Sequence, residues 1–186
     1  MSALMTSAPH PVPRQLVPDL SVPLVGGPRW RLCDQKPKHF TMLIFYRGLH
    51  CLECRNYLQQ AEARLKDFRA AGVSVIALSS DCEERGIATE RDWHLESLPL
   101  AYGLTEKQAR GYGLFISRGE GVTPLGIEEP PLFVEPGLFL VRPDRTLFFA
   151  SIQNMPFARP GLSEVLRMVE WTVLNGYPAR GDVEEC

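Results

Sequence analysis

The hydrophobic and polar positions between residues 42 and 71 predict a buried strand followed by an amphipathic helix. The apolar run Met42–Tyr46 carries no charge and is too short for a core helix, which is typical of a strand buried on both faces. After a short polar loop, apolar residues recur at helical spacing: Cys54, Leu58, Ala61, Leu65 and Phe68. Cys51 and Cys54 therefore lie where a central strand ends and a helix begins, which is the edge at which open α/β sheets form their sites.

The segments that follow continue the alternation of strand and helix. Val73–Leu78 predicts a second buried strand, parallel to the first because a helix connects the two. Two helices are expected after it, at Cys82–Leu95 and Thr105–Tyr112, and then a hairpin of Gly137–Val141 with Thr146–Ile152. The last helix is expected from near Pro160 to Asn175, and its buried residues are Leu162, Val165, Leu166, Val169 and Val173. Phe115–Pro136 has little periodicity, so a long functional or interaction loop is expected there.

The two ends of the chain are expected to lie outside this alternation. Residues 1–17 predict a disordered or extended arm, and Leu20–Leu32 predicts a short β-hairpin around Gly26 and Gly27. Residues 179–186 predict a loose polar tail, which leaves one domain at 18–178. The order is a hairpin, then β-α-β-α, then β-β-α. It predicts an α/β, thioredoxin-like fold with a central mixed sheet flanked by helices and an N-terminal β-hairpin extension.

Composition narrows the class of protein. The 186 residues are 45% hydrophobic and 23% charged, with a net charge of −2, which suits one globular domain and gives no reason to expect nucleic acid or an anionic membrane as a partner. No apolar run approaches the roughly 20 residues of a membrane span. The first residues lack the pattern of a signal peptide, and the five cysteines are not arranged as a disulfide framework. The expected location is cytoplasmic.

The Cys51-x-x-Cys54 spacing predicts reversible dithiol chemistry. A thiolate at a helix N-terminus faces unpaired N–H groups, which lower a thiol's pKa from about 8.5. We expect Cys51 to be the more exposed thiol and Cys54 the more buried one. A zinc half-site and inert packed thiols are the alternatives, but the sequence has no second CxxC to complete a zinc site. No phosphate-binding loop or dinucleotide fingerprint appears, so no cofactor is expected.

Several neighbours are weaker candidates for this chemistry. Arg47 is expected either to stabilise a thiolate or to be solvated at a strand end. His50 is either a proton shuttle or, more simply, an exposed loop histidine. Cys82 is either an auxiliary thiol or simply buried or helical. Cys186 pairs between chains, acts as a distant resolving thiol or is incidental.

Three stretches resemble one known family: FYRGLHCLEC, VSVIALSSDCEE and PGLFLVRPDRTLFFASIQNMPFARPGLSEVL. They are similar to the alkyl hydroperoxide reductase/thiol-specific antioxidant (AhpC/TSA) group, in its peroxiredoxin-like branch with a CxxC, over about residues 18–174. The resemblance places the family's peroxidatic cysteine on Cys54, its usual threonine on Cys51 and its usual proline on Arg47. Pro136 occupies the place of the family's arginine. Thioredoxins have a cis-proline at the corresponding point, so a cis Glu135–Pro136 bond is expected.

The resemblance and the motif together predict a thiol-dependent oxidoreductase working through a Cys51–Cys54 disulfide. Peroxide reduction, with Cys54 attacking, and disulfide exchange, with Cys51 attacking, both remain open. Either chemistry needs an external thiol reductant of the thioredoxin or glutathione type. The alternative is a redox-sensing or partner-binding module that uses the 115–136 loop. By similarity to peroxiredoxins, a homodimer is expected.

Overall fold

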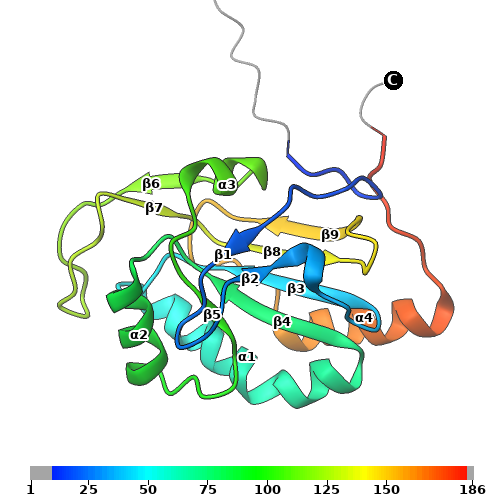
Figure 1. Cartoon of the computed structure of the whole chain (residues 1–186), viewed down its shortest axis with the longest axis horizontal. Helices are drawn as coiled ribbons and strands as arrows, with labels where there is room; N and C mark the ends of the chain where they lie inside the picture. The colour runs from blue at the N-terminus through cyan, green and yellow to red at the C-terminus, as the bar shows by residue number, and fades with distance from the viewer. Residues whose placement is uncertain (1–9, 184–186) are drawn as a thin grey trace, which may run out of the picture.

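A five-stranded mixed sheet forms the centre of the computed structural model, which describes residues 10–183 (Figure 1). Its strand order is β5-β4-β3-β8-β9. The strands are β3 (Phe40–Phe45), β4 (Val73–Leu78), β5 (Leu100–Ala101), β8 (Gly137–Val141) and β9 (Leu147–Ile152). β3 is parallel to β4 and antiparallel to β8, and β4 is also parallel to β5. The predicted thioredoxin-like architecture is thereby confirmed.

The apolar run on β3 is continuous because both faces of the sheet are covered. Met42 and Ile44 pack into one cluster with residues of α1 (Leu52–Ala70) and α4 (Leu162–Asn175). Leu43 and Phe45 alternate with them and pack into a second cluster with α3 (Glu106–Gly111) and the N-terminal segment. Figure 1 shows α1, α2 (Glu83–Asp92) and α4 on one side of the sheet and α3 on the other.

The N-terminal segment crosses the second face of the sheet. The predicted hairpin is present as β1 (Ser21–Val22) paired with β2 (Trp30–Arg31), and a short 3₁₀ turn, Leu32–Asp34, follows it. Before the hairpin, the described part of the predicted arm is extended, with bridges from Pro13 and Leu16 to the residues at the start of β9. Residues 1–9 of that arm lie outside the described residues.

The C-terminal segment packs against this arm. Arg14 donates to the Ala179 carbonyl at 3.2 Å and to the Asp182 carboxylate at 2.9 Å, and Ala179 is buried. The first residues of the segment predicted to be a loose tail are therefore held in place. Cys186 lies outside the described residues, so its predicted role is not addressed.

Two predictions about regular structure need correction. The stretch Phe115–Pro136 is not one long loop: β6 (Ile116–Arg118) pairs antiparallel with β7 (Leu132–Val134) and makes it a hairpin. Strands of three residues are too short to show an alternation of apolar and polar positions, and the many glycines and prolines of this stretch favoured a loop. On α4, Val173 was expected to be buried but is 39% exposed, and the neighbouring Thr172 is buried. No described helix is long and apolar enough to cross a membrane.

We expect Phe139→Ala to lower the free energy of unfolding by about 3–5 kcal/mol, because it empties a buried aromatic site. Phe139 is fully buried and lies edge-on to Phe45 and Tyr112, with ring centroids 5.5 and 5.3 Å away. Urea denaturation measures the change. Phe157→Ala is the matched control, because Phe157 is 74% exposed and its loss should change stability by less than about 0.5 kcal/mol. Equal effects of the two changes would contradict the packing described here.

Candidate active site

Cys51 and Cys54 form a disulfide at the start of α1. Cys51 is the N-cap residue of the helix, and its Sγ accepts the Cys54 backbone N–H at 3.2 Å. The two Cα atoms are 5.2 Å apart. Both side chains are buried, Cys51 being 5% exposed and Cys54 not exposed at all. The predicted position of the pair, at the end of the central strand with Cys51 the more accessible, is confirmed.

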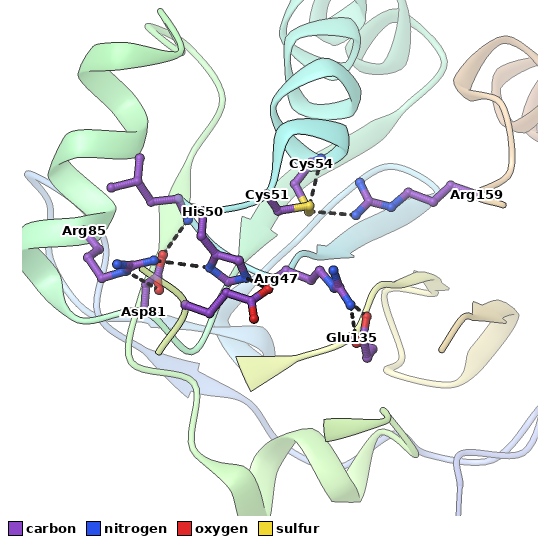
Figure 2. Close-up of a disulfide and its surroundings, with 10 residues drawn as sticks. Arg47, His50, Cys51, Cys54, Asp81, Arg85, Glu135 and Arg159 are labelled. Atoms are coloured by element: carbon purple, nitrogen blue, oxygen red, sulfur yellow. Dashed lines mark hydrogen bonds and ion pairs between the residues drawn. A yellow bond between two sulfur atoms is a disulfide. The ribbon is translucent and has the colours of Figure 1, made fainter. Parts of the chain in front are cut away.

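Arg159 is the cation that contacts the disulfide, and the sequence analysis did not single it out. Its Nη2 donates to the Cys54 Sγ at 2.9 Å, and its guanidinium lies over the Tyr57 ring at 4.9 Å (Figure 2). Burial lowers the pKa of Arg159 to about 10, so it stays protonated at neutral pH. Its Nε and Nη1 are buried and have no hydrogen-bond partner among the described residues. The only sequence signal was an arginine between the last strand and the last helix.

Arg47 does not contact either sulfur through any hydrogen bond or ion pair in the described chain. Its Nε and Nη2 each donate to the Glu135 carboxylate at 2.8 Å, and its guanidinium lies 5.0 Å from the Phe133 ring centroid. Ser117 donates a further hydrogen bond to the buried Glu135 at 2.5 Å. A bidentate ion pair with a carboxylate therefore occupies the Arg47 guanidinium, and its stabilisation of a thiolate stays a prediction.

Pro136 precedes β8, as the sequence analysis placed it, but the expected cis peptide bond is absent. The Glu135–Pro136 bond is trans. The Pro136 carbonyl accepts a hydrogen bond from the Gln153 backbone N–H at 3.0 Å and so joins the end of β9 to the start of β8. The backbone feature that favoured thioredoxin-like exchange is therefore missing.

Asp81 fixes the loop that leads into Cys51. It follows the end of β4, and its buried carboxylate accepts the Leu49 backbone N–H at 2.8 Å and Arg85 Nε at 2.8 Å. Gly48 has a φ of +131°, and a Cβ there would lie within 2.5–2.7 Å of the Asp81 carboxylate. Only glycine suits this position. The hydrogen bond from Leu49 to Asp81 thereby joins the end of β3 to the end of β4, at the edge of the sheet where the disulfide lies.

His50 is buried, so the expectation of an exposed loop histidine is wrong. Arg85 Nη2 lies 3.2 Å from its Nδ1, and because arginine is only a donor, Nδ1 is the acceptor and the proton is on Nε2. Nε2 has no hydrogen-bond partner among residues 10–183, and a Glu129 carboxylate oxygen is 4.0 Å away. Burial lowers the pKa of His50, against the opposing effect of Asp81. A neutral ring held this way does not supply positive charge to Cys51.

Cys33 and Cys82 take no part in the disulfide. Cys82 is the N-cap residue of α2 and is exposed rather than buried, and Cys33 is half-buried; both carry free thiols. Within residues 10–183, no three histidine, cysteine or acidic side chains lie close enough together to hold a metal ion. Figure 2 shows the disulfide with Arg159 on one side and the group of His50, Asp81 and Arg85 on the other.

Solved structures with this fold include several peroxiredoxins. Peroxidoxin BcpB from Mycobacterium tuberculosis is 18% identical with a TM-score of 0.68, over 88% of this chain and 99% of that one. The reduced 2-Cys peroxiredoxin of Plasmodium vivax is 14% identical with a TM-score of 0.71, over 90% and 86%. A peroxiredoxin-like protein from Aquifex aeolicus is 14% identical with a TM-score of 0.69, over 88% of each chain. At these identities the likeness establishes the fold.

Sequence similarity identifies the family. No curated protein is detectably similar to the chain. The family model described as AhpC/TSA matches residues 13–149. This range includes four strands of the central sheet, the first half of β9 and both cysteines of the disulfide. The resemblance seen in the sequence motifs is confirmed, and the chain belongs to the AhpC/TSA family of thiol-dependent oxidoreductases.

Proposed function

We propose that this protein reduces hydroperoxides, with Cys54 as the attacking thiolate and Cys51 as the resolving thiol. The observation that carries the proposal is the contact between Arg159 Nη2 and the Cys54 Sγ at 2.9 Å. A guanidinium at that distance favours the thiolate form of Cys54. Family membership and the peroxiredoxins among the solved structures support a peroxide as the substrate.

The reaction balances in two steps. The Cys54 thiolate attacks one peroxide oxygen, the O–O bond breaks, and the leaving oxygen takes up a proton as an alcohol or water. Cys54 is then a sulfenic acid. The Cys51 sulfur attacks the Cys54 sulfur, water leaves, and the Cys51–Cys54 disulfide forms. An external thiol of the thioredoxin or glutathione type supplies two electrons and two protons to restore both thiols.

Arg159 has donors free for the oxygen in this reaction. Its Nη2 holds the sulfur, and its Nε and Nη1 have no protein partner among the described residues. Negative charge develops on the leaving oxygen as the O–O bond breaks, and donors fixed beforehand stabilise such charge without reorganising. Arg47, which is paired with Glu135, contributes to the wall of the site rather than to the sulfur.

A second candidate is disulfide exchange through Cys51. Two observations favour it: Cys51 is the more exposed thiol, and its sulfur accepts the Cys54 amide at the N-terminus of α1. A thiolate there is stabilised by the helix end. The trans Glu135–Pro136 bond removes the main thioredoxin-like feature, and we therefore rank exchange second. A redox-sensing module without turnover is the third candidate.

The partner and location follow from the same chemistry. Cys33 and Cys82 carry free thiols, which suits a reducing compartment such as the cytoplasm. The reductant meets the pair at Cys51, the more exposed sulfur. A homodimer is part of the proposal by similarity to peroxiredoxins.

Trapping with single cysteine variants tests the assignment of the two sulfurs. We expect Cys51→Ser to accumulate a sulfenic acid on Cys54 when hydrogen peroxide or an organic hydroperoxide is added, because no resolving thiol remains. Dimedone labelling with mass spectrometry detects it. We expect Cys54→Ser to leave the peroxide unconsumed.

Other outcomes of trapping favour the other candidates. If Cys54→Ser accumulates mixed disulfides on Cys51 while Cys51→Ser is inert toward peroxide, exchange replaces peroxide reduction. If neither variant reacts and the unaltered protein shows no turnover with thioredoxin or glutathione, the redox-sensing candidate is favoured.

Substitution of Arg159 tests the observation on which the proposal rests. We expect Arg159→Gln to slow the oxidation of Cys54 by hydrogen peroxide by roughly 10- to 1000-fold, because the charge and the oxygen donors are lost together. Arg159→Lys keeps the charge but not the planar donor set, so an intermediate rate is expected. Stopped-flow fluorescence of the intrinsic tryptophans follows the reaction.

Arg167→Gln is the matched control for Arg159, because Arg167 lies exposed on α4 and pairs only with Glu164 among the described residues. Its rate should equal that of the unaltered protein. An Arg159→Gln variant that reacts within about threefold of the control would contradict a role in transition-state stabilisation.

The proposal leaves no acid–base role to His50, and pH-dependent stability tests its neutral state. Burial lowers the folded-state pKa of His50 below about 6.5, its usual value, so below that pH the unfolded chain binds a proton that the folded protein does not. Stability is therefore complete above about pH 6.5 and falls as the pH decreases, by at most about 1.4 kcal/mol per pH unit.

His50→Asn removes this titrating group while keeping an acceptor for Arg85. We expect the difference in unfolding free energy between the unaltered protein and His50→Asn to shrink as the pH falls from about 7.5 to about 5.5. Urea denaturation at a series of pH values measures it. Parallel pH curves for the two proteins would show that His50 does not titrate below its usual range.

A further inference from the structure

Tyr57 connects the helix that carries Cys54 to the segment that carries Arg159. Its ring lies under the Arg159 guanidinium, 4.9 Å from centroid to Cζ, and its hydroxyl donates to the Pro160 carbonyl at 2.8 Å. Tyr57 lies one turn after Cys54 on α1, so both side chains project from the same face of the helix (Figure 2 shows Arg159 approaching that end of α1). One residue thus contacts both the cation and the backbone next to it.

Arg159 needs such a contact because it is a buried cation without a carboxylate. No ion pair or hydrogen bond joins it to an acidic side chain in the described chain; its partners are the Cys54 sulfur and the Tyr57 ring. Burial is the main cause of its lowered pKa and the charge of Arg47 lowers it further, while Tyr57 and the more distant carboxylates of Glu53 and Glu135 raise it. A buried, uncompensated charge is unfavourable, and the face of an aromatic ring is among the few uncharged groups that attract it.

The segment around Arg159 has few other contacts: within residues 154–160 the buried side chain is that of Pro156. After β9 ends at Ile152, residues 154–160 form no regular structure, and Met155 and Phe157 are exposed. The hydrogen bonds that attach residues 154–160 to the rest of the described chain are the one from Tyr57 to Pro160 and the one from Arg159 to Cys54. Neither Tyr57 contact involves the sulfur atoms of the disulfide.

We propose that Tyr57 is a positioning residue, which holds the Arg159 guanidinium at the Cys54 sulfur and so sets the pH at which Cys54 becomes a thiolate. The ring orients the cation, and the hydroxyl fixes the backbone beside it. The inference rests on the proposed function for its catalytic meaning, but the effect on the thiolate does not depend on which substrate the protein reduces.

The test measures Cys54 in a Cys51→Ser background, where no disulfide can form. The rate of alkylation of Cys54 by iodoacetamide is followed by mass spectrometry against pH, and the pH of half-maximal rate is compared between variants. We expect Tyr57→Leu to raise that midpoint by about one pH unit, within the range expected when an opposite charge moves away from an ionisable group. Tyr57→Phe keeps the ring and should raise it by less than half as much.

A mutant cycle separates positioning from a general structural effect. If Tyr57 acts through Arg159, then in an Arg159→Gln background the change Tyr57→Leu adds no further shift. A shift of the same size in both backgrounds would overturn the inference, and so would a folded Tyr57→Leu variant whose midpoint is unchanged. Circular dichroism checks that each variant is folded, and mass spectrometry of the Cys54 peptide separates its alkylation from that of the free thiols of Cys33 and Cys82.

Tyr177→Leu is the matched control. Tyr177 also has an arginine over its ring, Arg180 at 5.5 Å, but it packs against Trp171 at the far end of α4. Its loss should leave the Cys54 midpoint unchanged. No peroxide enters these measurements, so failure of peroxide reduction in the trapping experiment would leave the Tyr57 result intact, and the two proposals can fail separately.

Discussion

The contact on which the site depends is the hydrogen bond from the Leu49 backbone N–H to the buried carboxylate of Asp81. It joins the loop after β3 to the end of β4, and Gly48 makes it feasible by leaving room for that carboxylate. The loop then delivers Cys51 to the N-cap of α1, where its sulfur accepts the Cys54 amide. Without this hydrogen bond the first turn of α1 would not be held in one direction. The positions of both sulfurs and of the Tyr57 ring depend on it, because these groups lie on the first two turns of α1.

Two arginines near the disulfide have different electrostatic roles because only one has a carboxylate. Arg47 and Glu135 form a bidentate pair, so their charges largely cancel at the distance of the sulfur. Arg159 has no such partner in the described chain and is more deeply held, against the Tyr57 ring. A single charge in a partly dry site acts more strongly on its neighbour than a neutralised pair. The positive charge of Arg159 therefore acts on the Cys54 sulfur more strongly than the charge of Arg47 does.

The sequence predicted the sheet and the sulfur pair well because both depend on local pattern. The continuous apolar run of β3 requires cover on both faces, and the CxxC at its end was placed by the strand-to-helix change alone. The prediction failed where the answer depends on contacts distant in sequence. Arg47 was expected to take the place of the family's arginine, but Arg159, 105 residues from Cys54, makes the contact with the sulfur. Likewise, the buried His50 contacts Phe133 and Arg85, which are both distant from it in sequence.

The contact between Arg159 and the Cys54 sulfur favours both the oxidation step and the reduction step of the proposed cycle. The reductant must attack the accessible sulfur, and Cys51 is the more exposed of the two. Cys54 is then the leaving group, and a thiol whose thiolate is stabilised leaves faster. Arg159, which favours the Cys54 thiolate before peroxide arrives, thus also favours its departure when the disulfide is reduced. The buried position of Cys54 keeps bulky thiols from that sulfur, so the exposures of the two residues and the placement of one cation together set the direction of attack in each step.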